Sequence, residues 1–386
     1  MGYSFSHEDV AFLGSAAGSA ALAEVDRLEL TTATHLRDLE RVRREFGASS
    51  GALIETVRLR RRATAKLVDT AAWLFTDDAL QQATPTLVAR HRAERLSGRT
   101  VHDVTCSIGA ELAELTRTCP AVIGSDLDDV RLSMAAHNLA ESRNILLAKA
   151  DALVSCSTGT VVIADPARRA DGRRTHDPAK LQPPLPDLLA AYPGRDLAVK
   201  CAPGLDFDRL NWSGEIEVVS LDGAVREACL WSAGLSEPGV TRRATVLSTR
   251  AEPLTFTDAD PDDIPERAPG EWIIDPDGAI VRAGLVRHYA AKHGLWQLDP
   301  KIAYLTGNSV PEGVRGFRIL DRLDLREKTL RQELTRRNCG PLEILTRGVD
   351  IDPDTLRKRL KPRGTHPYTL ILTRLARTTA AFLCTT

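Results

Sequence analysis

Residues 100–126 read TVHDVTCSIGAELAELTRTCPAVIGSD, and the pattern in this segment is the main evidence for the fold class. A short run with β-branched residues ends at Asp103, a loop of small residues follows, and a helical stretch leads to a second apolar run that ends at Asp126. The same alternation continues through DVRLSMAAHNLAES, ILLAKADA, TVVIADP, PDLLAAY and DLAVKCAP. Short apolar runs that alternate with helical stretches predict an α/β fold with a doubly wound, parallel sheet.

Carboxylates close the predicted strands in succession. Asp126 follows Asp103 by 23 residues, Asp151 follows 25 residues later, and Asp165 ends the next strand. Each acid alone could be a helix N-cap. Because parallel strands end at one edge of a sheet, the series instead predicts a shared ligand crevice. There, Asp126 suits the two hydroxyls of a ribose, and Asp151 suits an adenine amino group.

The loop after the first strand, VTCSIGAE, contains a single glycine, Gly109. A dinucleotide site would have GxGxxG, whose glycines let the backbone approach a diphosphate. A cofactor without phosphate but with an ammonium and a sulfonium, such as S-adenosylmethionine, is better matched by an acid at this strand end. Asp103 is that acid.

The fourth strand ends in ADPARR, which carries Asp165, Pro166 and Arg168. Asp165 and Pro166 give a rigid carboxylate beside the expected methyl group, and Arg168 with Arg169 could clamp a phosphate; the alternative is a polar turn. Lys200 lies within the apolar strand LAVKC, where a charge needs a partner. It either pairs with an acid such as Asp165 or faces the crevice.

The remaining chain predicts further domains. Residues 1–96 are nearly free of proline and predict a helical N-terminal domain, with apolar residues at helical spacing from Leu59 to Leu74. Its stretch VRLRRRATAK is read as a solvated helix face or as an anion-binding surface. Residues 97–250 form the sheet domain, and their strands EIEVVSLDG and EACLWSAGL predict an antiparallel pair at the end of the sheet.

Residues 251–280 predict a connector, because they hold nine acidic residues against one basic residue and five prolines. The last domain, residues 281–386, is predicted to be α+β. Its residues 301–386 carry 17 Lys and Arg against 9 Asp and Glu, which gives this part a charge of about +8 in a chain whose net charge is −1. Such a surface suits RNA phosphates, although an ordinary basic surface would look the same.

The sequence also argues against a secreted, a membrane-spanning or a metal-binding protein. No signal peptide and no run of about 18 apolar residues is seen, so we expect a cytoplasmic protein without a membrane partner. The seven cysteines are dispersed and form no CxxC pair, which predicts reduced thiols and no metal site.

Taken in order, DVTCSIGAE, VIGSDLDD, KADA and DPARR resemble the class I, Rossmann-like methyltransferases that use S-adenosylmethionine. The segment QQATPTLVARHRAERL resembles the helix before this motif in RNA-modifying members, where a Thr-Pro or Ser-Pro N-cap starts a helix over the cofactor. EWIIDPDGAIVRAGLV, AYLTGN and LEILTRGVDIDPDTLRKRLKPRG resemble the THUMP-like domain of bacterial methyltransferases.

The resemblance implies roles for individual residues. Those implied to bind S-adenosylmethionine are Gln82, Thr84, Asp103, Thr105, Cys106, Gly109, Asp126, Leu127, Asp151 and Ala152. Asp165 to Arg168 stand where amino-group methyltransferases have a (D/N)PP-aromatic motif, and Asp165, Pro166, Arg168 and Lys200 are the implied catalytic residues. The chain departs from the pattern at Ser107, Ala167 and Arg168, the last of which replaces an aromatic residue that stacks on a flipped base.

The expected function is methylation of a base in structured RNA, either tRNA or rRNA. Ser107 and Ala167 keep an alternative open, a catalytically degenerate pocket in an RNA-binding or adaptor protein. A nucleotide-dependent oxidoreductase is disfavoured by the missing GxGxxG.

Overall fold

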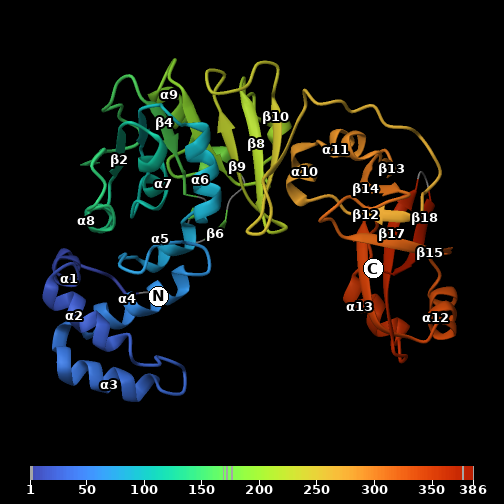
Figure 1. The fold of residues 1–386 in the computed structure, drawn as a ribbon, viewed down its shortest axis with the longest axis horizontal. Helices are drawn as coiled ribbons and strands as arrows, with labels where there is room; N and C mark the ends of the chain where they lie inside the picture. Colours follow the sequence, from blue (N-terminus) through green and yellow to red (C-terminus); the bar gives the residue numbers. More distant parts are fainter. Residues whose placement is uncertain (1–2, 168, 171–172, 175–176, 376–377, 386) are drawn as a thin grey trace. The chain divides into compact units, whose positions relative to one another are not determined.

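The structure is a computed structural model that describes residues 3–167, 169–170, 173–174, 177–375 and 378–385. The chain divides into two compact units (Figure 1). The first comprises Met1–Ile216 and Glu227–Glu237, and the second comprises Glu217–Arg226 and Pro238–Thr386.

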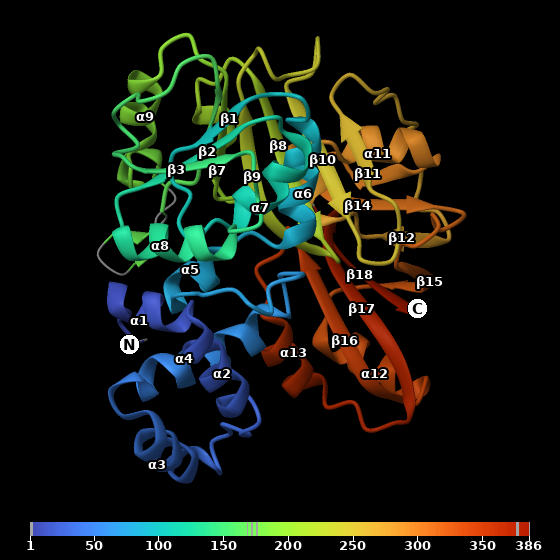
Figure 2. The same ribbon diagram turned by 60° about the vertical axis from the view of Figure 1, so that its left-hand side comes forward.

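The first unit begins with helices, as predicted. They are α1 (His7–Leu13), α2 (Ala16–Val25), α3 (His35–Phe46), the 3-10 helix η1 (Gly47–Ser49), α4 (Ser50–Ala63), α5 (Asp77–Gln82) and α6 (Thr86–Arg95). Ser6 starts α1 in a reciprocal capping box with Asp9, which satisfies amides that have no partner within the helix. Figure 2 shows α1 beside α8, and Met134 of α8 belongs to the apolar core of the helical region.

The helical periodicity between Leu59 and Leu74 overestimates α4, which ends at Ala63. Leu67 and Leu74 are buried in the core of the helical region, but they lie in the irregular segment between α4 and α5 rather than on a helix. The Arg60 guanidinium donates hydrogen bonds to the carbonyl oxygens of Ala72 and Trp73, so the side chain of α4 holds the irregular segment in place. Burial of leucines at helical spacing therefore did not require a helix.

The parallel sheet of the first unit has the order β3-β2-β1-β4-β7. This part of the chain contains β1 (Val101–Asp103), α7 (Ala110–Thr118), β2 (Val122–Asp126), α8 (Asp129–Asn138), β3 (Ile145–Lys149), β4 (Val161–Ala164), β5 (Arg169–Ala170), β6 (Arg173–Arg174), η2 (Pro178–Lys180), α9 (Leu185–Ala191), β7 (Leu197–Cys201) and η3 (Phe207–Arg209). Strands β5 and β6 are not part of the parallel sheet but form an antiparallel pair of their own. Val101 is in register with Val122 on one side and Val161 on the other. Buried apolar residues on both faces are typical of a parallel sheet covered by helices, and α6 packs along α7 (Figure 1).

The strands predicted to end the sheet form β8 (Glu215–Leu221) and β9 (Ala224–Trp231), and the boundary between the two units passes through this hairpin. In the first unit, β9 is antiparallel to β7. In the second unit, β10 (Arg242–Leu247) lies next to β8 and is followed by β11 (Leu254–Thr257), so the hairpin is not terminal. The prediction missed β11 because this strand falls within the acidic, proline-rich segment; β10 precedes that segment and was not recognised as a strand.

The second unit also contains a seven-stranded sheet of order β13-β14-β12-β15-β18-β17-β16. Its further elements are β12 (Trp272–Ile274), α10 (Gly278–Ala283), α11 (Val286–His293), β13 (Trp296–Asp299), β14 (Ile302–Gly307), β15 (Gly316–Leu323), α12 (Glu327–Arg336), β16 (Cys339–Arg347), α13 (Pro353–Leu360), β17 (His366–Leu375) and β18 (Thr378–Thr385). The segment 251–280 thus contributes two strands, because its prolines at 261, 265 and 269 fall between β11 and β12.

Candidate functional site

A cavity of about 430 Å³ lies at the carboxyl ends of β1, β2, β3 and β4 in the first unit. The four strand-end carboxylates, Asp103, Asp126, Asp151 and Asp165, all line it. The other residues predicted for the site that line the cavity are Gln82, Thr84, Thr105, Cys106, Leu127, Ala152 and Lys200. The parallel strands bring together side chains that are up to 118 residues apart in the sequence (82 to 200).

Three predicted site residues are not among the lining residues. Gly109 is the N-cap of α7 and has a left-handed backbone with φ of 86°. Pro166 is buried. Arg168 lies outside the residues that the structure describes.

The loop between β1 and α7 is tied to the strand end of β2. The Ser107 amide donates a hydrogen bond of 2.9 Å to Asp126 Oδ2, and the Asp128 amide donates one of 3.0 Å to Asp126 Oδ1. Ser107 itself has φ of 50°, the left-handed region where glycine is favoured. Asp126 therefore has a fixed orientation, while its two oxygens keep lone pairs for a ligand.

Asp103 is buried at the bottom of the cavity. Thr105 donates to Asp103 Oδ1 from its amide, at 3.0 Å, and from its hydroxyl, at 3.2 Å. Burial raises the pKa of Asp103 to about 7; the Thr105 amide and the Lys200 ammonium counteract that rise, whereas Glu111 and Asp165 add to it. The Asp103 carboxyl is thus only partly ionised at neutral pH. A bound cation would stabilise its anionic form.

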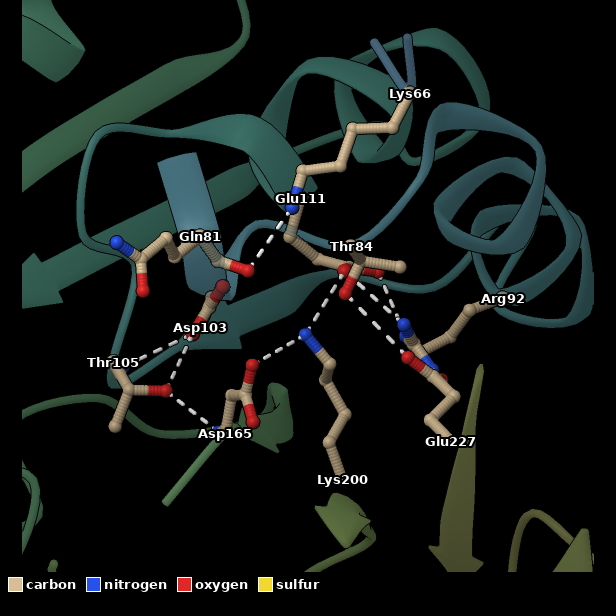
Figure 3. A network of polar contacts seen from close by, with 10 residues as sticks. All are labelled: Lys66, Gln81, Thr84, Arg92, Asp103, Thr105, Glu111, Asp165, Lys200 and Glu227. Atoms are coloured by element: carbon tan, nitrogen blue, oxygen red, sulfur yellow. Dashed lines mark hydrogen bonds and ion pairs between the residues drawn. The ribbon is translucent and has the colours of Figure 1, made fainter. Parts of the chain in front are cut away.

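A chain of alternating charges continues from the cavity into the protein (Figure 3). Arg92, on α6, donates to both oxygens of Glu111 at 2.7 and 3.1 Å and also to Glu227 on β9. All three side chains are buried. Burial alone would lower the pKa of Arg92, but Glu111 and Glu227 hold it well above its usual value. The guanidinium remains charged and fixes both carboxylates.

Lys200 links this network to the cavity. Its ammonium donates a hydrogen bond of 2.6 Å to Asp165 Oδ2 and lies 3.6 Å from Glu111 Oε2. Burial would lower the pKa of Lys200, but Asp165 and Glu111 raise it above its usual value. Both alternatives for Lys200 therefore hold, since it pairs with Asp165 and also lines the cavity. The backbone of Asp165 is held as well, by a 2.7 Å hydrogen bond from its amide to Thr105 Oγ1.

One expectation from the sequence needs correction, and an alternative that was left open can be narrowed. Thr84 does not cap α6, because the N-cap of this helix is Pro85, which makes no side-chain hydrogen bond. The Thr84 hydroxyl instead donates a hydrogen bond of 3.5 Å to Glu227. The stretch VRLRRRATAK is a solvated helix face at Arg61 and Arg62, which are exposed and also bind other parts of the helical region. Arg61 pairs with Asp26, and Arg62 pairs with Asp77.

Glu111, Arg92 and Glu227 were not predicted. Each occurs in a helix or strand that resembles many others, and only the fold shows that their charges meet in a buried position. The available signal for Glu111 was its place two residues after Gly109, at the start of a helix that opens toward a ligand crevice.

The fold and the site define a class. A doubly wound sheet whose strand tips carry carboxylates around one cavity, without a glycine-rich diphosphate loop, is that of a nucleoside-cofactor enzyme of the class I methyltransferase type.

Comparisons with known proteins agree. Residues 314–386 match the THUMP domain-like family, and residues 6–63 match a domain of unknown function, DUF8688. The chain is 54% identical over 344 residues to an uncharacterized S-adenosylmethionine-dependent methyltransferase of Mycobacterium tuberculosis H37Rv, covering 86% of this chain and 95% of that protein. The same identity and coverage apply to the protein of strain CDC 1551. The chain belongs to this family of S-adenosylmethionine-dependent methyltransferases with a THUMP-like domain, which confirms the predicted enzyme class and cofactor.

A solved structure supports the fold. The crystal structure of a Porphyromonas gingivalis W83 protein assigned as a methyltransferase matches with a TM-score of 0.75, 19% identity and 99% coverage of both chains. At this identity the likeness concerns the fold alone. In the described part of the chain, no helix is long and apolar enough to cross a membrane. Within the same residues, His, Cys, Asp and Glu form no group of three or more that could hold a metal ion.

Proposed function

We propose that the strand-end cavity binds S-adenosylmethionine and that the protein methylates a base in structured RNA, either tRNA or rRNA. The observation that carries the proposal is that Asp103, Asp126 and Asp151 share one cavity with the Asp165–Lys200 pair. S-adenosylmethionine, when bound, supplies a methyl group on a sulfonium.

The residues present fit this cofactor. A cavity of about 430 Å³ is within the size range of small-molecule sites. Asp126 would accept hydrogen bonds from the ribose hydroxyls, and Asp151 would accept one from the adenine amino group. Leu127 and Ala152 follow these acids and offer apolar surface to the base. Asp103, with Thr105, would face the cationic methionine end, where its partly protonated carboxyl would ionise.

The support for RNA is electrostatic. Residues 301–386 carry a charge of about +8 and include the whole THUMP domain-like region, residues 314–386. Phosphate contacts from such a surface would hold RNA without reading its sequence. The short hairpin β5–β6 begins four residues after Asp165, and Arg169, Arg173 and Arg174 occupy three of its four paired positions. We also infer a cytoplasmic location, where such RNA is found.

The test uses the purified full-length protein with CD3-labelled S-adenosylmethionine and with tRNA and rRNA from a strain that lacks the gene. We expect label in one nucleoside that is undermethylated in that strain, as detected by nucleoside mass spectrometry. Heat-denatured protein is the control. Tight binding of S-adenosylhomocysteine without label in any RNA would contradict the RNA part of the proposal and leave the cofactor site standing.

A further inference from the structure

We infer that the methyl acceptor is the lactam edge of a nucleobase, a ring N–H beside a carbonyl as in guanine or uracil, which Asp165 and Lys200 recognise together. The inference deepens the proposed function and rests on it. The observation behind the inference is that Asp165, a hydrogen-bond acceptor, and Lys200, a donor, both line the cavity with their oxygen and nitrogen 2.6 Å apart.

In the Asp165–Lys200 pair, Lys200 is the hydrogen-bond donor, and its ammonium stays charged and fixed in position. Lys200 is fixed between Asp165 and Glu111, and Arg92 fixes Glu111 in turn. An ammonium has three N–H donors and no acceptor. The described structure gives it one hydrogen bond, to Asp165, and a longer ion pair at 3.6 Å, to Glu111. A target group beside Lys200 must therefore present an acceptor, because a second donor would meet N–H against N–H.

An exocyclic amine does not meet this requirement. It presents two N–H donors and no acceptor of its own, and it gains positive charge as its nitrogen is methylated. Because Lys200 donates its hydrogen bond to Asp165 Oδ2, this positive charge would develop beside a fixed ammonium, which opposes it. The replacement of the second proline and the aromatic residue by Ala167 and Arg168 is a second departure from amine-methylating sites.

A lactam meets the requirement with both of its groups. Its N–H donates to the Asp165 carboxylate, and its carbonyl oxygen accepts from Lys200. In the transfer, the ring N–H bond breaks and an N–CH3 bond forms with its electron pair. The proton goes to Asp165, and the electron pair of the broken carbon–sulfur bond stays on sulfur. Negative charge that develops on the carbonyl oxygen is stabilised by the fixed ammonium, as in other preorganised anion sites.

The first test locates the CD3 label within the RNA nucleoside. We expect ring-N-methylated guanosine or uridine. Label on an exocyclic amine, as in N2-methylguanosine or N6-methyladenosine, or on a ribose 2′-oxygen would overturn this inference while leaving RNA methylation intact. No label in any RNA would overturn the RNA proposal and this inference with it.

Atom replacement and a variant pair sharpen the test. If the target is guanosine, a transcript with inosine there keeps the lactam and loses only the amine, so methylation should persist within about threefold; loss of methylation would contradict the lactam. Lys200→Met should lower kcat by about 100-fold, and Lys200→Arg, which keeps a cation, by about 10-fold. Both variants should bind S-adenosylhomocysteine within about threefold of wild type, which shows that the fold is kept. Equal activity of the two variants would contradict a role for the charge.

Discussion

At the scale of single residues, the site depends on charged side chains that are buried in the folded protein. Asp103 has a pKa of about 7 in the folded protein because burial disfavours its anion. In the unfolded chain the same carboxyl has an ordinary, lower pKa. Between about pH 4 and pH 7 the folded protein therefore binds a proton that the unfolded chain has released. Stability from this group is present at acidic pH and is lost as the pH rises toward 7.

The pH dependence can be isolated with Asp103→Asn, which removes the titration and keeps an oxygen for the Thr105 amide. We expect the variant to gain on wild type by about 1 to 3 kcal/mol in free energy of unfolding between pH 5 and pH 8. The measurement is urea unfolding of both proteins at each pH. An unchanged difference between variant and wild type would show that Asp103 does not titrate in this range.

Arg92 gives a second prediction, because it neutralises two buried carboxylates. Arg92→Met leaves Glu111 and Glu227 without their partner and should lower the free energy of unfolding by about 3 to 5 kcal/mol. Arg90→Met, on the same helix, removes a single pair between a partly exposed arginine and the buried Glu114 and should cost less, about 1 kcal/mol. Similar losses in the two variants, measured by urea unfolding, would argue against a special role for the buried network.

At the scale of elements, the turn between β1 and α7 packs closely against Leu139 at Gly109. A Cβ at this position would be strained at φ of 86° and would lie 2.7 Å from Leu139 Cδ1. Gly98 also has a positive φ, 75°, but a Cβ there would meet no atom within 4 Å. An alanine at Gly98 would therefore suffer backbone strain alone, whereas an alanine at Gly109 would suffer both backbone strain and crowding.

We therefore expect Gly109→Ala to lower the free energy of unfolding by about 2 to 4 kcal/mol. Gly98→Ala, which adds only left-handed backbone strain, should lower it by about 1 kcal/mol. Thermal unfolding of the two variants gives the comparison. Equal shifts in Tm would mean that Leu139 accommodates the methyl group without cost.

The sequence predicted the elements that repeat a simple pattern. Alternating strands and helices after Thr100 were confirmed, because buried parallel strands and amphipathic helices leave distinct periods in the sequence. The end of α4 and strand β11 were not predicted, since Leu67 and Leu74 are buried in an irregular segment at helical spacing and β11 is short. For the site, strand-end acids were accessible to prediction, whereas the Arg92–Glu111–Glu227 cluster was not. Its members come from three elements, and only tertiary contacts define their partners.

At the scale of the whole molecule, charge is distributed unevenly along the chain. Residues 301–386 are basic, whereas the remaining residues sum to about −9. Exposed Lys358 and Arg359 on α13 belong to the basic part, within the THUMP domain-like region. If this part contacts phosphates, RNA affinity must depend on salt and on these charges.

The double variant Lys358→Glu and Arg359→Glu should weaken tRNA binding by about 10-fold and reduce the slope of log affinity against log salt by about 2. Arg43→Glu with Arg44→Glu, on exposed positions of α3, is the charge-matched control and should have a smaller effect. Filter binding at several salt concentrations measures both. An equal loss in the two double variants would show that only net charge matters.

The most direct measurement of the central claim, that the strand-end carboxylates hold the cofactor, is calorimetric titration of S-adenosylhomocysteine into Asp126→Ala. Loss of the hydrogen bonds to two ribose hydroxyls should weaken binding by about 100-fold. Asp129→Ala, three residues away and ion-paired with Lys149 outside the cavity, should leave the affinity unchanged. An unaltered Kd for a folded Asp126→Ala would contradict the assignment of this cavity.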